Sequence, residues 1–236
     1  MLEDPQGNPP VEEVKNYLDC RFGDERSLLH SIRTQCKDEQ LPEIQISVHV
    51  GKMMYLMAKM QKAKRILEIG TLGGYSTAWL AQALPHEGRL ISLEINEEYA
   101  EKAKKHLKEV RGPNIEIRVG HAVELLAKIA ESGEGPFDLI FIDADKENYA
   151  LYLDWSLRLS REGTVILIDN LIPKGPIVGY PCHDEAKHVY AFNDYLAQHP
   201  MLEVAVFPTL TRKQGRLDAM AVAYVKGPFK VLLNRP

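Results

Sequence analysis

The sequence predicts an α/β fold in which a mostly parallel, seven-stranded sheet carries helices on both faces. From residue 65 onward, short apolar runs alternate with segments of helical periodicity. Most of these runs are continuously apolar, as strands covered on both faces require. The last two runs flank a short polar turn, TRKQGR, which predicts an antiparallel hairpin that closes the sheet.

The elements of the core follow in order from these patterns. Parallel strands are expected at about 65–70, 89–95, 115–120, 137–144 and 163–169. The helices between them are expected at about 75–84, 97–110, 121–131 and 147–160. A helix at about 184–198 precedes the two hairpin strands, which are expected at 202–208 and 218–225.

The residues before this core predict a helical extension. We expect a single domain over 1–236, with an N-terminal helical part at 1–60, whose first ten residues are disordered, and the α/β core at 61–236. Helical spacing predicts one helix over 11–18, a second capped by Asp24 and a third from Ser47. The third helix carries an apolar stripe, expected to pack on the sheet or on a partner subunit, made of Val50, Met53, Met54, Met57 and Met60.

The composition is that of an ordinary globular protein, with 45% hydrophobic residues, 26% charged residues and a formal net charge of -4. This charge gives no basic field for nucleic acid or an anionic membrane, so we expect neither as a partner. The three cysteines lack metal-ligand spacing, and their odd number argues against a disulfide framework. With no long apolar run and no signal peptide at the start of the sequence, we expect a cytoplasmic protein.

The stretch RILEIGTLGGYS, residues 65–76, predicts a buried strand, a tight turn and the start of a helix. A ligand can lie against the backbone of such a turn because glycine has no Cβ. The glycines at Gly70, Gly73 and Gly74 do not match G-x-G-x-x-G, which disfavours a nicotinamide-dependent oxidoreductase.

Two carboxylates accompany this turn. Glu94 ends the next strand, where an acidic side chain can bind both hydroxyls of a ribose, and Glu68 lies in the strand before the turn. An adenosine that carries an amino-acid tail in place of phosphates suits two carboxylates, which describes S-adenosylmethionine. In the alternative interpretation, Glu94 only caps a strand and Gly70 is a plain turn.

Oxygen-bearing side chains follow two later strands. Asp143, Asp169 and Asn170 would form a hard-cation site, since Mg²⁺ and Ca²⁺ prefer carboxylate and amide oxygens; alternatively, they are turn formers. Lys146 is a candidate general base, or a helix-start lysine paired with Asp145 or Glu147.

The remaining polar candidates, Asp145 and the histidines, do not all point to one site. Asp145 is expected either to accept a hydrogen bond from the cofactor or to position Lys146. His121 is expected near the adenine, whereas His49, His86 and His106 are expected at the surface.

Taken together, the sequence resembles the cation-dependent, S-adenosylmethionine-dependent O-methyltransferases that include catechol O-methyltransferase and the caffeoyl-CoA O-methyltransferases. The likeness covers almost the whole chain after residue 40. It is carried by QISVHVGKMM, RILEIGTLGGYSTAWLA, LISLEINEEYA, FDLIFIDADKENYALYLDW and GTVILIDN.

The resemblance implies a Rossmann-like class I methyltransferase fold with its last strand antiparallel, and it assigns the site. Lys146 and Asp143 are the implied catalytic residues, and the implied metal ligands are Asp143, Asp169 and Asn170, for Mg²⁺ or for Ca²⁺ or Mn²⁺ in its place. The expected cofactor-binding residues, including those placed near the cofactor above, are Ile46, Glu68, Gly70, Ser76, Glu94, Ala122, His121, Asp143 and Asp145.

The activity that the resemblance implies is methyl transfer from S-adenosylmethionine to a hydroxyl of a small, catechol-type aromatic acceptor, by a homodimer. Methylation of a non-catechol alcohol or amine, or a cofactor-binding protein with a decayed acceptor site, are the alternatives. The chain departs from the family at the final hairpin turn, around Gly215 and Arg216, and its acceptor loop is its own, with Tyr180 as a candidate for the pocket wall.

Overall fold

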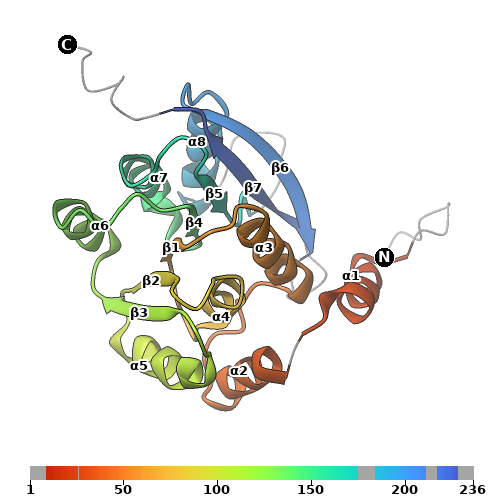
Figure 1. Cartoon of the computed structure of the whole chain (residues 1–236). Helices are drawn as coiled ribbons and strands as arrows, with labels where there is room; N and C mark the ends of the chain where they lie inside the picture. The colour runs from red at the N-terminus through yellow and green to blue at the C-terminus, as the bar shows by residue number, and fades with distance from the viewer. Residues whose placement is uncertain (1–8, 26, 175–183, 211–216, 228–236) are drawn as a thin grey trace, which may run out of the picture.

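A seven-stranded sheet forms the centre of the computed structural model, which describes residues 9–25, 27–174, 184–210 and 217–227. The strand order is β3-β2-β1-β4-β5-β7-β6 (Figure 1). The pairs from β3 to β5 are parallel, whereas β7 runs antiparallel to both β5 and β6. The predicted fold class and its antiparallel strand are confirmed. The strands are β1 (Arg65–Ile69), β2 (Arg89–Glu94), β3 (Asn114–Val119), β4 (Leu139–Ile142), β5 (Val165–Ile168), β6 (Leu202–Leu210) and β7 (Leu217–Val225).

Two layers of helices cover the sheet (Figure 1). Successive strand residues enter opposite layers because side chains alternate along a strand: Ile66 packs in one apolar cluster and Leu67 in the other. One cluster includes residues of α2 (Ser27–Asp38), α3 (Val48–Met60), α4 (Tyr75–Ala81) and α5 (Glu97–His106). The other includes residues of α6 (Ala122–Glu131), α7 (Tyr149–Arg158) and α8 (Asp184–Ala197). The short elements are α1 (Val11–Leu18), the π-helical turn η1 (Asp19–Gly23) and the 3₁₀ turns η2 (Leu107–Glu109) and η3 (Lys146–Asn148).

Most predicted elements are present, with differences at their ends. Asp24 does not cap α2, which begins at Ser27; instead it follows η1 in the left-handed conformation, with φ 46°. β4 is shorter than predicted, and Asp138, just before it, accepts the backbone N–H groups of Lys64 and Arg65 through its side chain, at 2.8 and 3.0 Å. The polar turn at 211–216, most of the expected disordered start and the acceptor loop from residue 175 to 183 lie outside the described residues.

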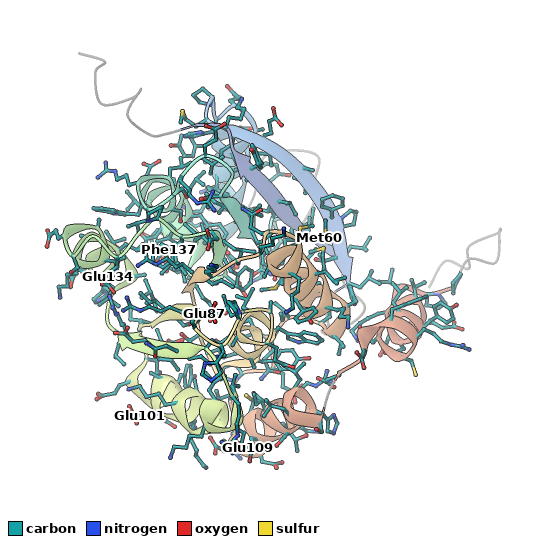
Figure 2. The ribbon with its side chains drawn as sticks, in the orientation of Figure 1. Met60, Glu87, Glu101, Glu109, Glu134 and Phe137 are labelled. Atoms are coloured by element: carbon teal, nitrogen blue, oxygen red, sulfur yellow. The ribbon has the colours of Figure 1, made fainter. Side chains whose placement is uncertain are left out.

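The apolar stripe of α3 is only partly buried. Val50, Met54 and Ala58 form its buried face at four-residue spacing, and Met53 and Met57 pack partly buried beside it. Met60, labelled in Figure 2, ends the helix with 79% of its surface exposed, so it does not pack on the sheet, and its packing on a partner subunit stays a prediction. None of the helices in the described part of the chain is both long and apolar enough to cross a membrane.

We expect Met54→Ala to lower the free energy of unfolding by about 2–5 kcal/mol, because it removes a fully buried side chain between α3 and the sheet. The matched control, Met60→Ala, truncates an exposed side chain on the same helix and should change it by less than about 0.5 kcal/mol. Urea unfolding of both variants checks this. Equal losses in the two variants would contradict the assigned packing of α3.

Candidate functional site

The candidate site lies at the carboxyl ends of β1, β4 and β5, which are neighbours in the sheet. This is where ligands bind in open α/β sheets, on either side of the point at which strand order reverses. Gly70 follows β1, Asp143 follows β4, and Asp169 and Asn170 follow β5. A Cβ on Gly70 would lie 2.0 Å from the carbonyl oxygen of Asp143. Only glycine therefore allows the two backbones to approach this closely.

Lys146 connects the side chains at the ends of β4 and β5. Its Nζ donates to Asn170 Oδ1 at 2.7 Å and to the Ala144 carbonyl at 2.9 Å, and lies 3.4 Å from Asp143 Oδ1. Nζ also donates to the hydroxyl of Tyr149 and lies 4.5 Å from the centre of that ring. Only 13% of the Lys146 side chain is exposed. The predicted metal ligands Asp143 and Asn170 thus share one cationic partner, and the expected pairing of Lys146 with Asp145 is not observed.

Asp169 carries the strongest electrostatic perturbation in this group. Burial, and then the neighbouring Asp143 carboxylate, raise the pKa of Asp169 to about 8. One of its oxygens accepts the backbone N–H of Asn170 at 2.9 Å. Tyr149 is fully buried, which raises its pKa well above the usual value, and its hydroxyl donates to the Asp169 carbonyl at 3.1 Å. The Asp143 carboxylate beside the buried Asp169 makes this a place that favours added positive charge.

The donor set fits a hard divalent cation. Asp143, Asp169 and Asn170 offer carboxylate and amide oxygens, the ligands that Mg²⁺ and Ca²⁺ prefer. The ammonium of Lys146 already occupies a position between two of these three side chains. Among the described residues no group of three His, Cys, Asp or Glu side chains is suited to hold a metal, so a cation here depends on the amide of Asn170 and on water.

The turn after β1 is held by Glu94. One carboxylate oxygen of Glu94 accepts the N–H groups of Leu72, at 2.7 Å, and Thr71, at 3.3 Å, and the other accepts that of Asn96 at 2.9 Å. Leu72 has a positive φ of 49°, which a leucine adopts only at a cost. Glu94 therefore shapes the turn as well as standing at the position predicted for a ribose ligand.

Glu68 is completely buried in β1. Its Oε2 accepts the hydroxyl of Ser92 at 2.6 Å and that of Thr77 at 2.5 Å. Its Oε1 has no hydrogen-bond partner within the described residues. Burial raises the pKa of Glu68 to about 7, although the neighbouring hydroxyls favour the carboxylate. A buried acid with an unpartnered oxygen is suited to meet a donor group of a ligand.

The other predicted cofactor residues surround this edge of the sheet. Ile46 is buried just before α3, Ser76 lies in the first turn of α4, and His121 and Ala122 begin α6 after β3. Asp145 is already engaged by its own helix, since it accepts from Tyr152 Oη and Asn148 Nδ2. Asp145 therefore does not position Lys146. Tyr180, the candidate for the pocket wall, is outside the described residues.

Two residues of this region were not predicted from the sequence. Tyr149 is part of the recognised stretch IDADKENY, and its three-residue spacing from Lys146 was the available signal. His106 was predicted at the surface, which is wrong, because only 2% of it is exposed. The Nδ1 atom of His106 lies 3.0 Å from the carbonyl oxygen of Gly73, so this nitrogen has a hydrogen-bond partner although the ring is buried. His49 is also largely covered and pairs with Asp19 at 2.9 Å.

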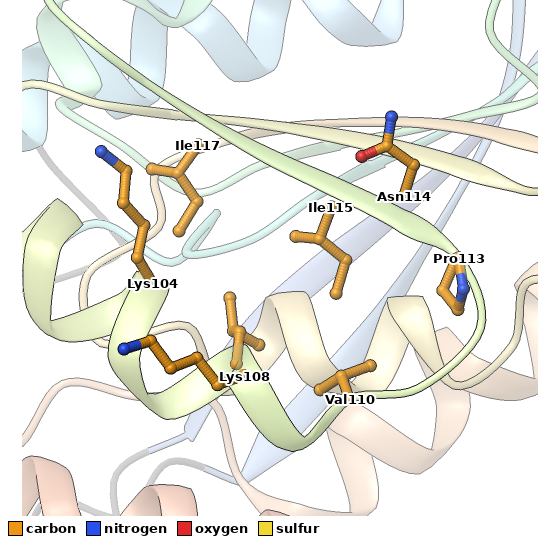
Figure 3. A pocket seen from close by; sticks show the side chains of 8 residues that line it. Lys104, Lys108, Val110, Pro113, Asn114, Ile115 and Ile117 are labelled. Carbon is orange, nitrogen blue, oxygen red and sulfur yellow. The ribbon is translucent and has the colours of Figure 1, made fainter.

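Two hollows lie apart from the candidate residues. One, of about 320 Å³, lies between α5, η2 and β3 and is bordered by apolar side chains and by Lys104 and Lys108 (Figure 3). The other, of about 700 Å³, lies among α1, α2 and the segment before α3. Neither is lined by any of the predicted catalytic, metal or cofactor residues.

The fold and the site define an α/β protein with a ligand turn after β1 and an acid–lysine cluster after β4 and β5. The family model for O-methyltransferases matches residues 21–213, and the chain belongs to this family. It is 38% identical over 221 residues to the catechol O-methyltransferase of Niastella koreensis (93% of this chain, 99% of the relative). It is also 38% identical to that of Mycobacterium tuberculosis (96% of this chain, 100% of the relative). The structure of an O-methyltransferase from Bacillus cereus in complex with SAH aligns with a TM-score of 0.84 at 34% identity, over 92% of this chain and all of that one.

Glu68 gives the ligand-free protein a specific pH dependence. Its pKa is raised from 4.5 to about 7, so the folded state holds a proton that the unfolded chain has released, and stability falls as pH rises through this window. From about pH 5.5 to pH 8, the titration of Glu68 should lower the free energy of unfolding of the wild-type protein by about 2 kcal/mol. In Glu68→Gln, the drop in unfolding free energy between these two pH values should be smaller by that amount, as measured by urea unfolding. Parallel pH profiles would contradict the assignment.

Proposed function

We propose that this chain transfers the methyl group of S-adenosylmethionine to a hydroxyl of a small, catechol-type aromatic acceptor, with a divalent cation and Lys146 as a base. The observation that carries the proposal is the position of Lys146. Its Nζ lies beside Asp143 and Asn170, at the ends of two neighbouring strands and next to the turn after β1. A basic group is thereby placed among acidic ligands at the ligand-binding edge of the sheet.

The cofactor assignment is supported by the turn and its carboxylates, and by the bound SAH of the Bacillus cereus relative. S-adenosylmethionine supplies an electrophilic methyl group when bound. We propose that Glu68 and Ser76 contact its amino-acid end and that Glu94 binds its ribose. Ile46 and Gly70 would contribute backbone contacts, and His121 and Ala122 would lie against the adenine. Asp143 would border both the cofactor and the cation.

The cation assignment is supported by the oxygen donors and by their surplus negative charge. We propose Asp143, Asp169 and Asn170 as its ligands, with Mg²⁺ as the first choice. When bound by these residues, a divalent ion would lower the pKa of an acceptor hydroxyl. Asp169 is 6% exposed, so this side of the site is shielded from water, which strengthens its electrostatic interactions.

We propose that Lys146 acts as the base in its neutral amine form, in which the lone pair of Nζ takes the proton of the attacking hydroxyl. The ammonium donates to three oxygens, of Asn170, Ala144 and Tyr149, which fix where this nitrogen lies; the amine form would give up one of these donated bonds. Tyr149 in turn is held by the Asp169 carbonyl. The catechol class is supported by the names of the two bacterial relatives, which match this chain over almost its whole length.

We also propose that the protein is a homodimer, a single domain and cytoplasmic. Four large apolar side chains are exposed on α3 and on the hairpin: Leu56 by 47%, Met60 by 79%, Phe207 by 45% and Tyr224 by 43%. Phe207 pairs with Met220, which belongs to the apolar cluster of α3, so Phe207 and α3 share one side of the sheet. An exposed apolar surface of this kind is suited to a protein interface. The cytoplasmic setting is supported by the unpaired, buried thiol of Cys36.

With S-adenosylmethionine, Mg²⁺ and a simple catechol, we expect the wild-type protein to form S-adenosylhomocysteine, and we expect EDTA to suppress the product. Lys146→Met should lower kcat by about 10²–10⁴-fold, because it removes a positioned proton acceptor. Its affinity for S-adenosylmethionine, measured by calorimetry, should stay within about twofold. Asp143→Ala should lose both turnover and the response to Mg²⁺.

The matched control is Lys104→Met, which changes an exposed lysine on α5 and should leave kcat unchanged. EDTA-insensitive turnover would exclude the cation, and full activity in Lys146→Met would exclude the base. If only non-catechol acceptors gave product, the protein would still be a methyltransferase, but the proposed catechol class of acceptor would be wrong.

The proposed dimer surface makes a separate prediction. Met60→Glu introduces a charge at the exposed end of α3, so it should shift the protein from dimer to monomer without lowering its melting temperature. Sedimentation velocity measures the change. The control, Leu151→Glu, places the same charge on an exposed apolar position of α7, which packs on the opposite face of the sheet, and should remain dimeric. A wild-type monomer would refute the proposal.

A further inference from the structure

The peptide between Gly73 and Gly74 joins two adjacent glycines inside the turn after β1. Glycine adopts positive and negative φ about equally well, so a Gly–Gly peptide can turn over more readily than any other. Gly74 has φ 81° and occupies the position directly before α4. A ligand can lie close to the backbone of such a turn, but the two glycines themselves do not restrict the orientation of the peptide between them.

His106, the last residue of α5, holds this peptide from outside the turn. Its Nδ1 lies 3.0 Å from the Gly73 carbonyl oxygen, and its side chain is fully buried. At the other end of the same peptide, the Gly74 N–H donates to the Thr71 carbonyl at 2.9 Å. The peptide plane is therefore fixed at both ends, and the fixed orientation requires a donor at Nδ1.

Glu39 and Cys36 are the neighbours of the His106 ring. Its Nε2 lies 3.3 Å from Glu39 Oε2 without a hydrogen bond between these two atoms, and the other oxygen of Glu39 accepts from Lys105 at 2.7 Å. The thiol of Cys36 is a second, weaker donor to the Gly73 carbonyl oxygen, at 3.7 Å. A Cβ on Gly73 would lie 2.3 Å from that sulfur, so α2 leaves room for glycine alone. The turn is thus enclosed by α2 and α5 on the side away from Glu94.

We propose that His106 is a positioning residue for the cofactor: it keeps the Gly73–Gly74 peptide in the orientation that binds S-adenosylmethionine. This inference rests on the proposed function, since it assigns a role toward that ligand. Without the Nδ1 donor, the turn populates a second orientation. The apparent affinity for S-adenosylmethionine is then reduced in proportion to the fraction of protein whose turn keeps the binding orientation. The loss of one neutral hydrogen bond corresponds to about a fivefold weaker affinity.

Three variants test the inference by calorimetric titration with S-adenosylmethionine and by steady-state kinetics. His106→Leu removes the donor and should raise Kd and KM for S-adenosylmethionine about fivefold, with kcat nearly unchanged. His106→Asn retains a side-chain amide donor close to the position of Nδ1 and should restore Kd to within about twofold. His106→Met repeats the removal with a more flexible apolar side chain, in case the leucine variant does not fold. His86→Leu, at an exposed histidine, is the control and should bind as wild type.

The outcomes separate this inference from the proposed function. If the Leu, Met and Asn variants all bind S-adenosylmethionine with the Kd of wild type, His106 has no positioning role. If Asn binds as weakly as Leu, or if all three variants lose melting temperature and kcat together, the role is structural only and the inference is overturned. If wild type itself does not bind S-adenosylmethionine, the proposed function fails first.

Discussion

The structure depends on how closely the backbone after β1 approaches the backbone after β4. A side chain at Gly70 would overlap the carbonyl oxygen of Asp143, so the glycine sets the distance between the ligand turn and the acidic cluster. The parallel register of β1 with β4, and of β4 with β5, then brings Asp143 together with Asp169 and Asn170. The sheet thereby determines the position of the site, and the loops supply its chemistry.

Electrostatic imbalance is the second organising feature. Asp143 and Asp169 are neighbours, and the ammonium of Lys146 lies beside Asp143. A buried carboxylate beside a second, partly exposed one is unfavourable unless positive charge or protons compensate it. The raised pKa of Asp169 shows how the ligand-free protein compensates, by holding a proton. A divalent ion would remove that need, so the same arrangement that strains the free protein favours cation binding.

The sequence predicts the sheet and the site positions better than it predicts the environments of single side chains. Continuous apolar runs fix strands wherever both faces are buried, and side chains at strand ends meet because parallel strands end at one edge. His106 was misjudged because its two partners, Gly73 and Glu39, lie far from it in the chain, and no local pattern reports such contacts. The partners of Asp145, Tyr152 and Asn148, are local in the chain, but the rotamers that bring them together are not visible in sequence.

The N-terminal helices contact the segments that surround the candidate site. Tyr75, next to the glycine turn, donates to Glu25 at 2.6 Å, which ties α4 to the segment before α2. Burial opposes ionisation of Asp19, yet hydrogen bonds from His49 and Lys15 outweigh it and hold the pKa of Asp19 at about 2. His49 lies two residues after Ser47, and Asp19 is the first residue of η1. The bond between His49 and Asp19 therefore connects η1 to the Ile46–Ser47 segment, where the cofactor is proposed to bind. Together with the contact of α2 on Gly73, these contacts bring the N-terminal helices against the turn and the segment that are proposed to bind the cofactor.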